Sequence, residues 1–303
     1  TMKRVKVILN PIAGRGHGAR VVGQIRQILQ SEALDFEMAL TEAPWHAAEL
    51  AERAAYDGFD VIAAAGGDGT TNEVINGLMR ANEEGTKAVL GMIPIGSGCD
   101  LACTLNVSTD LMAACRGLTN GRPRWIDIGL VKVDDAPPRY FGNIVGIGFD
   151  GIVNLESQKI KRVRGLAQYL PAVLKTIFLY YKALRVTIAY DDQTLEMSAL
   201  MVCVTNGPRE GGGFLVAPDA RYDDGLFDLC MAGEVSRLEM LRMIPRFLKG
   251  THAGHAAITM ARTSEVTISS PQSLVAHIDG ESLCTQAHRI ACSILPHRLQ
   301  IMT

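Results

Sequence analysis

The sequence predicts a two-part α/β protein, in which an α/β domain is followed by a mainly antiparallel β domain. In the first third of the chain, short apolar strand patterns alternate with helical patterns. After about Asp127, strand patterns separated by tight turns dominate. The chain has 303 residues, 48% of them apolar, which is enough for two domains with their own cores.

The first part has the pattern of parallel βαβ units. Apolar and β-branched runs predict strands at 5–9, 36–40, 61–65 and 89–93. Helical spacing of apolar residues predicts helices at 21–29, 46–55 and 71–80. Because strand and helix alternate, we expect a parallel sheet whose ligand-binding loops follow the carboxyl ends of the strands.

The second part has strand patterns separated by turns such as Asp191-Asp192. Strands are predicted at 140–149, 186–190, 195–205, 226–231, 266–268 and 275–278. A helical insert is predicted at about 151–184 and a further amphipathic helix at 236–249. A last strand pattern at 290–294 could belong to either domain.

Charge and cysteine content exclude several classes of protein. The net charge of −2 disfavours a general nucleic-acid binder. The seven cysteines form no CxxC pair, so we expect reduced core thiols in a cytoplasmic protein rather than a disulfide framework or a zinc knuckle. We expect no signal peptide. The longest apolar stretch, 166–184, is interrupted by Pro171, Lys175 and Lys182 and is a poor membrane span.

The most informative segment is the string GGDGTTNEVINGL at 66–78, between a predicted strand and a predicted helix. Gly66, Gly67 and Gly69 lack a Cβ, so a bulky anion can approach their backbone closely. Thr70 and Glu73 have the spacing of a capping box, which predicts the start of the helix there. The N–H groups of that helix terminus would attract phosphate.

Asp68 is a carboxylate among these glycines, where it would repel phosphate unless a cation intervened. A Mg²⁺ ion that bridges Asp68 and nucleotide phosphates resolves this conflict. The alternative is a tight strand–helix turn that binds no ligand.

Two further loops follow predicted strands and should lie at the same sheet edge. One is Asn10-Pro11-x-x-Gly14-Arg15-Gly16, which matches neither the P-loop nor the GxGxxG pattern. The other contains Gly96 and Ser97, whose N–H and hydroxyl groups can contact phosphate. Three glycine-rich loops after three parallel strands indicate a phosphate site more strongly than any one of them.

The motifs of the chain resemble those of the diacylglycerol kinase catalytic-domain family, which includes bacterial soluble lipid kinases and the sphingosine and ceramide kinases. The resemblance covers nearly the whole chain. It rests on Asn10-Pro11-x-x-Gly14, Thr41 with His46-Ala47, 66–78, 94–102, Gly146-x-Gly148-Phe149-Asp150, Asn206, Gly211-Gly212-Gly213, Pro218, Asp224-Gly225-Leu226 and Asp279-Gly280-Glu281.

This resemblance implies a phosphofructokinase-like α/β nucleotide-binding domain plus an antiparallel β-sandwich domain. The first would comprise 1–127 and about 290–303, and the second, which receives the lipid, 128–289. The implied activity is transfer of the γ-phosphate of ATP to a lipid hydroxyl, most simply diacylglycerol or a related lipid, with Mg²⁺. The implied nucleotide-binding residues are Asn10, Pro11, Gly14, Thr41, Gly66, Gly67, Asp68, Gly69, Thr70, Thr71, Asn72, Gly96 and Ser97.

The resemblance also implies roles for carboxylates. Glu281 resembles the family's general base, and Asp68 its phosphate- and Mg²⁺-side carboxylate. Asp279 would either orient Glu281 or bind a second Mg²⁺. Without the resemblance, residues 279–281 would be read as a hairpin turn. Arg221, Asp224 and Leu226 match a structural Mg²⁺ site, with Arg221 and Leu226 contributing backbone carbonyls.

One position departs from the family pattern. The third loop of the family usually contains Asn where this chain has Cys99. The change removes an amide donor and acceptor, and it puts nucleotide affinity in question.

A basic and apolar segment suggests contact with a membrane. Lys159, Lys161, Arg162 and Arg164 precede apolar residues at helical spacing, a combination that suits an anionic lipid surface. The alternative is a core helix with a solvated basic start. The apolar residues are Leu166, Tyr169, Leu170, Leu174, Ile177, Phe178 and Tyr181.

Two other functions compete with the lipid kinase. NAD kinase shares the GGDGT loop, although Asn72-Glu73-Val74 and the late Asp279-Gly280-Glu281 favour the lipid kinase. A catalytically weak nucleotide- or lipid-binding regulator is suggested by Cys99 alone. We expect a peripheral membrane protein that binds no nucleic acid, and a homodimer by family analogy only.

Overall fold

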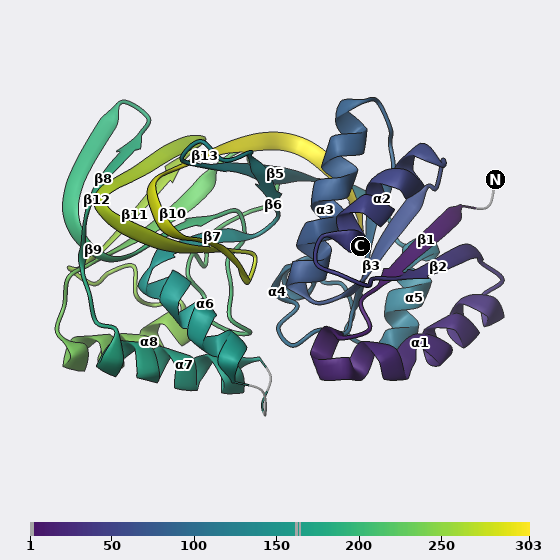
Figure 1. Ribbon diagram of the computed structural model, residues 1–303, viewed down its shortest axis with the longest axis horizontal. Helices are drawn as coiled ribbons and strands as arrows, with labels where there is room; N and C mark the ends of the chain where they lie inside the picture. Colours follow the sequence, from purple (N-terminus) through teal and green to yellow (C-terminus); the bar gives the residue numbers. More distant parts are fainter. Residues whose placement is uncertain (1–2, 161–162, 164) are drawn as a thin grey trace. The chain divides into compact units, whose positions relative to one another are not determined.

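The computed structural model describes residues 3–160, 163 and 165–303, and it divides the chain into two compact units. Unit 1 comprises Thr1–Ile126 and His297–Thr303, and unit 2 comprises Asp127–Pro296. The last seven residues thus return to unit 1, whereas residues 290–296, predicted to return with them, belong to unit 2. Figure 1 shows the elements of both units.

Unit 1 is a parallel sheet covered by helices (Figure 1). The strand order is β4-β3-β1-β2, and Ile301 near the chain's end pairs in parallel with Leu90 of β4. The strands are β1 (Arg4–Leu9), β2 (Asp35–Leu40), β3 (Val61–Gly66) and β4 (Val89–Pro94). The helices are α1 (Ala13–Ser31), α2 (His46–Tyr56), α3 (Asp68–Glu83), α4 (Asp100–Thr104) and α5 (Leu111–Asn120).

The β1 strand shows how the sheet of unit 1 is buried on both faces. Val5, Val7 and Leu9 point into one core together with Ile25 of α1 and Leu118 of α5. Ile8 between them is also fully buried. Such strands are near-continuous apolar runs, which is why the sequence predicted them correctly.

Unit 2 is a mainly antiparallel β-sandwich with three helices on one face of a sheet. Its strands run in the order β11-β10-β9-β7-β12-β13, and β8 pairs with both β9 and β12. The strands are β5 (Pro123–Val133), β6 (Arg139–Phe141), β7 (Ile144–Gly148), β8 (Leu184–Tyr190), β9 (Gln193–Thr205), β10 (Phe227–Gly233), β11 (Ile258–Thr263), β12 (Glu265–Ile278) and β13 (Glu281–Met302).

The helices of unit 2 are α6 (Phe149–Lys159), α7 (Leu166–Leu179) and α8 (Arg237–Lys249). Unit 2 has two hydrophobic cores, and alternate residues of one strand pack into each. Leu229 and Met231 of β10 face the interior of the sandwich, and Cys230 faces the helices. Figure 1 shows α7 and α8 lying beside each other on the helical side of unit 2.

Several element predictions need correction. The predicted strands 266–268 and 275–278 are one strand, β12, because register shifts between Ser269 and Leu274 carry it past Pro271. The piece at 290–294 is the middle of the 22-residue β13. The predicted strand 140–149 is β6 and β7, after which α6 begins at Phe149. Four elements, α4, α5, β5 and β11, were not predicted from the sequence.

The predicted helical insert is two helices, α6 and α7. The basic residues Lys161, Arg162 and Arg164 of the predicted membrane segment lie outside the described residues. None of the helices in the described parts of the chain is long and apolar enough to cross a membrane.

Candidate functional site

The predicted nucleotide loops meet at one edge of the sheet of unit 1. The strands are parallel, so their carboxyl ends lie together, and backbone hydrogen bonds join consecutive loops. The Thr41 N–H donates to Leu9 O at 2.9 Å, the Asn10 N–H donates to Ala65 O at 3.0 Å, and the Gly96 N–H donates to Gly66 O at 3.0 Å. The loops that contain Asn10, Thr41, Gly66 and Gly96 therefore form one continuous edge.

Glycines in two of these loops allow the loops to touch. A Cβ on Gly96 would lie 2.3 Å from the Cα of Gly67, and a Cβ on Gly66 would lie 2.4 Å from the side chain of Thr70. Both distances are shorter than real Cβ atoms allow. The glycines are therefore needed for packing of loop against loop, in addition to any role in phosphate binding.

Helix α3 begins at Asp68, with Gly67 as its N-cap, and no side chain caps its N-terminus. The predicted capping box is wrong because both of its side chains have other partners. Thr70 accepts a hydrogen bond from Asn10 Nδ2 at 3.0 Å, and Glu73 accepts one from the Ala47 N–H at 3.1 Å. Without a side-chain cap, this terminus presents its N–H groups and positive dipole to an anion.

The remaining predicted loop residues have different environments. Gly14, Arg15 and Gly16 are three consecutive residues with positive φ that interrupt the first turn of α1. Ser97 is exposed, whereas Asn72 is buried and accepts a hydrogen bond from Asn76 Nδ2. Pro11 and Gly69 are half-buried, and Thr71 donates to Gly67 O.

The predicted general base lies on the tight hairpin between β12 and β13. Asp279 and Gly280 have φ values of 45° and 84°, as in the primed turns that join antiparallel strands, and Glu281 follows as an exposed residue. The Asp279 carboxylate is buried and accepts three backbone N–H groups, from Gly142, Asn143 and Ile144, at 2.8, 3.0 and 2.8 Å.

Both oxygens of Asp279 are thus used by the backbone, which leaves this carboxylate poorly suited to the second Mg²⁺ that was one of its two predicted roles. What it does in the structure is anchor the hairpin. The hairpin is held from α6 as well, because Gly280 O accepts from Asn154 Nδ2 at 2.8 Å and from Gln158 Nε2 at 3.2 Å. The two residues that precede Glu281 in the hairpin are therefore both held in place.

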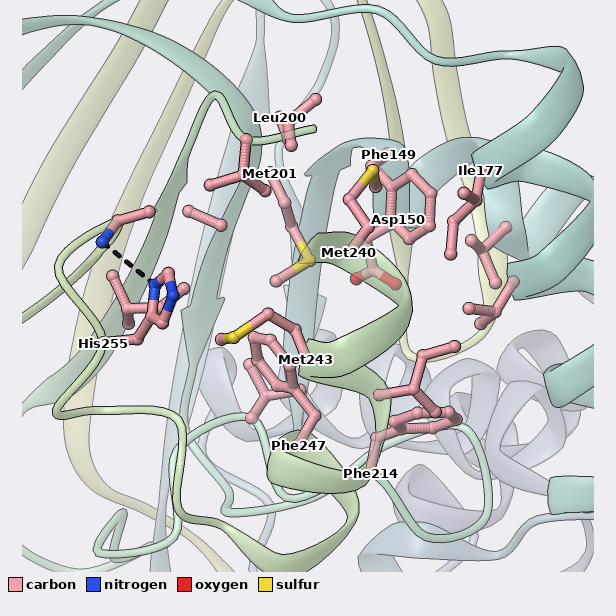
Figure 2. A pocket seen from close by; sticks show the side chains of 18 of the residues that line it. Phe149, Asp150, Ile177, Leu200, Met201, Phe214, Met240, Met243, Phe247 and His255 are labelled. Carbon is pink, nitrogen blue, oxygen red and sulfur yellow. Dashed lines mark hydrogen bonds between the residues drawn. The ribbon is translucent and has the colours of Figure 1, made fainter. Parts of the chain in front are cut away.

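A large apolar pocket lies within unit 2, between α6, α7, α8 and the sheet. Its empty volume is about 810 Å³, counting the part open to solvent. Helix α7 contributes Tyr169, Val173 and Ile177, which are spaced one turn apart. In Figure 2 the carboxylate of Asp150 lies among apolar side chains such as Phe149 and Met240. The sequence did not predict this pocket, because its wall is assembled from residues 149 to 258.

The pocket adjoins the hairpin that carries Glu281. Asp150 in the pocket wall and Asn154, which binds Gly280 O, are one turn apart on α6. The hydroxyl of Tyr169, another wall residue, lies 3.2 Å from Asn154 Nδ2. Helix α6 thus connects the pocket with the predicted base inside a single unit.

Comparison with known proteins finds a family match for each of the two parts of the chain. Residues 4–131 match the diacylglycerol kinase catalytic domain, and residues 143–303 match the YegS C-terminal NAD kinase beta sandwich-like domain. A diacylglycerol kinase of Bacillus subtilis (strain 168) is 32% identical over 283 residues, which cover 92% of this chain and 90% of that one. The chain belongs to the diacylglycerol kinase family.

Other relatives extend the comparison. A diacylglycerol kinase of Staphylococcus epidermidis is 31% identical over 281 residues, covering 92% of this chain and 86% of that one. A solved structure of a diacylglycerol kinase from Bacillus anthracis str. Sterne superposes with a TM-score of 0.74 over 99% of this chain and 96% of that one, at 23% identity. That likeness shows the fold. As a member of the family, the chain is a kinase that phosphorylates a hydroxyl group.

Cys99, the position where this chain departs from the family pattern, lies in the edge formed by the predicted nucleotide loops. Cys99 has a φ of 51°, a left-handed conformation, and its thiol donates weakly to Gly66 O at 3.7 Å. Burial, and then the nearby Asp68 carboxylate, raise the pKa of Cys99 to about 12. The residue is therefore a neutral thiol that joins the third loop to the second.

The residues present at Asp68 fit a Mg²⁺–nucleotide. A carboxylate is a ligand that Mg²⁺ prefers, and this one stands in the first turn of α3, whose N-terminus has no side-chain cap. One Asp68 oxygen also accepts the Leu101 N–H, at a long 3.3 Å. This contact positions Asp68 between the second and third loops.

The second predicted cation site is arranged differently. The Asp224 carboxylate pairs with the guanidinium of Arg262 and accepts the Leu226 N–H at 3.2 Å. Arg262 Nε also lies 3.4 Å from Asp228 Oδ1. Arg262 thus supplies the positive charge here, and the residues do not fit a cation at Asp224 unless that guanidinium moves. Mg²⁺ at Arg221, Asp224 and Leu226 stays a prediction from the family resemblance.

Proposed function

We propose that the chain transfers the γ-phosphate of ATP to the hydroxyl group of a lipid, with diacylglycerol or a related lipid as the acceptor. The observation that carries this proposal is the apolar pocket of unit 2, which α6 connects to the hairpin of Glu281. An apolar pocket of this kind suits an acyl chain, and it would offer the polar second dinucleotide of an NAD kinase few partners.

In this proposal each residue has a limited task. The loops at Asn10, Gly66 and Gly96 and the N-terminus of α3 bind the triphosphate of ATP. When bound, Mg²⁺ at Asp68 neutralises phosphate charge. Glu281 accepts the proton of the acceptor hydroxyl. Asp279 anchors the turn that precedes Glu281, and Asn154 holds the carbonyl of Gly280 in that turn.

Filling the pocket should impair use of the lipid and spare use of ATP. Ala232 lies in the pocket wall on β10, and Ala232→Phe is expected to raise the KM for a diacylglycerol at least about tenfold, because one aromatic ring displaces a large part of an acyl chain. The KM for ATP should stay as in the wild type. Steady-state kinetics with varied lipid and varied ATP measure both constants.

The matched control is Ala189→Phe, the same substitution at an exposed position of β8 that does not line the pocket. It should leave both constants unchanged. An Ala232→Phe enzyme with a wild-type KM for the lipid would show that the acceptor does not bind in this pocket.

We further propose that α7 lies against the membrane surface. One face of this helix lines the pocket, and its other face and C-terminal end expose large apolar side chains, which soluble proteins seldom gather in one place. Phe178 is 56% and Leu179 is 66% exposed, with Leu174 and Tyr180 beside them. Lys159 contributes less positive charge than the sequence suggested, because it pairs with the buried carboxylate of Glu156 at 2.6 Å. Lys175 of α7 pairs with the same carboxylate at 2.5 Å.

Removal of this apolar face should weaken membrane binding. The double variant Phe178→Ser, Leu179→Ser is expected to bind phosphatidylglycerol-containing vesicles at least about tenfold less tightly, as measured by sedimentation of the vesicles. The reason is that the two serine side chains have far less apolar surface to transfer from water into the membrane. Met112→Ser, at a similarly exposed apolar residue of α5, is the control. Equal sedimentation of the wild type and the double variant would contradict the assignment of α7.

A further inference from the structure

A buried cluster of four potential metal ligands lies at the wall of the apolar pocket, and the proposed transfer step does not use it. The four are Asp150 at the start of α6, Cys203 on β9, Glu210 in the loop after β9, and His277 on β12. The ligand atoms of Asp150, Cys203 and Glu210 all lie within 4.8 Å of one another. His277 Nε2 is 2.8 Å from Asp150 Oδ2 and 3.4 Å from Glu210 Oε2.

The spacing of these atoms is close to that of ligands around one zinc ion. Tetrahedral zinc binds nitrogen and oxygen at about 2.0–2.2 Å and sulfur at about 2.3 Å, which separates neighbouring ligand atoms by about 3.3–3.5 Å. Cys203 Sγ is 3.5 Å from Asp150 Oδ2, and Glu210 Oε2 is 3.4 Å from His277 Nε2. A hydrogen bond holds Asp150 and His277 closer, at 2.8 Å, and this pair would have to open by about 0.5 Å.

The donor atoms have the chemistry that zinc prefers. One thiol, one imidazole and two carboxylates form a mixed sulfur, nitrogen and oxygen set, whereas Mg²⁺ selects oxygen ligands alone. Four protein ligands also leave no open coordination position, which is the mark of a structural zinc site and not of a catalytic one. Such a site would be separate in kind from Mg²⁺ at Asp68.

Glu210 presents an oxygen without a hydrogen bond to the interior of the cluster. Its side chain is only 9% exposed, and Oε2 has no hydrogen-bond partner within the described parts of the chain. The carboxyl group otherwise interacts with Asp150 and His277, and the Nε2 of His277 is bonded to Asp150. Three acidic groups thus share one imidazole. A buried acceptor without a partner costs free energy, which a bound cation would recover.

The backbone leaves space for the cluster between two of its ligands. Gly146 of β7 is paired in register with Cys203 of β9 on one side and with His277 of β12 on the other. Residues paired in register point to the same face of a sheet, so the three positions form one row. A Cβ on Gly146 would lie 1.9 Å from Asp150 Oδ2 and 2.3 Å from His277 Nε2. The missing side chain therefore creates the cradle in which the ligand atoms meet.

We propose that Asp150, Cys203, Glu210 and His277 form a structural site for Zn²⁺. On binding, the metal takes the place of the Cys203 thiol proton and of the proton on His277 Nε2, and these protons pass to solvent. The ion would tie α6 to β9 and β12. Because β12 leads within four residues to Glu281, the site would fix the wall of the pocket and the hairpin of Glu281 together.

Cobalt substitution tests the proposal without relying on turnover. The chain is freed of metal with EDTA and titrated with CoCl₂ in the absence of oxygen. A thiolate-to-cobalt charge-transfer band in the near ultraviolet reports a sulfur ligand, and intense d–d bands in the visible report tetrahedral coordination. We expect both to saturate at one Co²⁺ per chain. ZnCl₂ should bleach both, with a Kd of about 0.1 µM or tighter.

Variants identify the ligands. Cys203→Ala should abolish the charge-transfer band, and Cys292→Ala, which removes a buried thiol of β13, is the matched control that should keep it. Glu210→Gln should weaken binding of Zn²⁺ at least about tenfold and should lose the rise in thermal midpoint that ZnCl₂ gives the wild type. This second readout serves where Cys203→Ala fails to fold. Asp68→Asn should keep both bands, which separates the site from the nucleotide edge.

Three results would each overturn the proposal: no saturable binding of Co²⁺, binding without a charge-transfer band, or a band that Cys203→Ala retains. Equal affinity of the wild type and Glu210→Gln for Zn²⁺ would overturn it as well, since four ligands are required. Phosphorylation of a lipid is assayed separately and decides the proposed function, which stands or falls independently of this site.

Discussion

Glu281→Gln is expected to lower kcat for lipid phosphorylation by about 10²- to 10⁴-fold, the usual contribution of a general base. The amide keeps the shape of the side chain but cannot accept the proton of the acceptor hydroxyl. Because Glu281 is exposed on a hairpin that other residues anchor, the fold should be unaffected. Single-turnover rates with saturating lipid and ATP separate this loss from changes in binding.

Two controls show whether the loss of turnover in Glu281→Gln comes from the missing base. The KM for ATP and the thermal midpoint of Glu281→Gln should match those of the wild type. Glu265→Gln, at an exposed position at the start of β12, the strand that pairs with the β13 strand of Glu281, should keep full turnover. If Glu281→Gln turned over lipid within about threefold of the wild-type rate, the base would have to be another group.

Asp279→Ala is expected to destabilise unit 2 by about 3 kcal/mol or more. The substitution leaves the N–H groups of Gly142, Asn143 and Ile144 buried without their carboxylate acceptor, and each such loss costs about 1–3 kcal/mol. Activity should also fall, because the hairpin of Glu281 loses its anchor. Urea unfolding measured by circular dichroism gives the change in the free energy of unfolding.

Asp192→Ala provides the matched control for stability, since Asp192 is an exposed carboxylate in the β8–β9 turn. It should change the free energy of unfolding by less than about 0.5 kcal/mol. Asp279→Asn, which retains one acceptor oxygen, should fall between the two. A stability of Asp279→Ala equal to that of the control would mean that the three N–H groups find other partners.

The sequence predicted the α/β domain well, because its buried parallel strands are continuous apolar runs and its loops carry glycine. Local patterns also placed α8, whose N-cap Ser236 accepts a hydrogen bond from the Glu239 N–H as helix-start rules expect. The same rules failed at Thr70 and Glu73, because Asn10 and Ala47, distant in sequence, bind their side chains.

Features that depend on tertiary contacts were not accessible from the sequence. Asp279 was read as an acid that orients the base or binds a metal, but its three N–H partners lie more than 130 residues away in the chain. The buried cluster of Asp150, Glu210 and His277 could not be predicted either, because no local motif brings these three residues together. The sequence signals at this place were the motif Gly146-x-Gly148-Phe149-Asp150 and the three glycines that follow Glu210.

The central claim is tested most directly by following labelled phosphate. The chain is incubated with [γ-³²P]ATP, Mg²⁺, vesicles that contain diacylglycerol, and NAD, and the products are separated by phase partition and chromatography. We predict that the label appears in phosphorylated lipid, and that Asp68→Asn and Glu281→Gln each lower the rate of its transfer at least about 10²-fold. Label that appears in NAD, or in neither acceptor, would contradict the account.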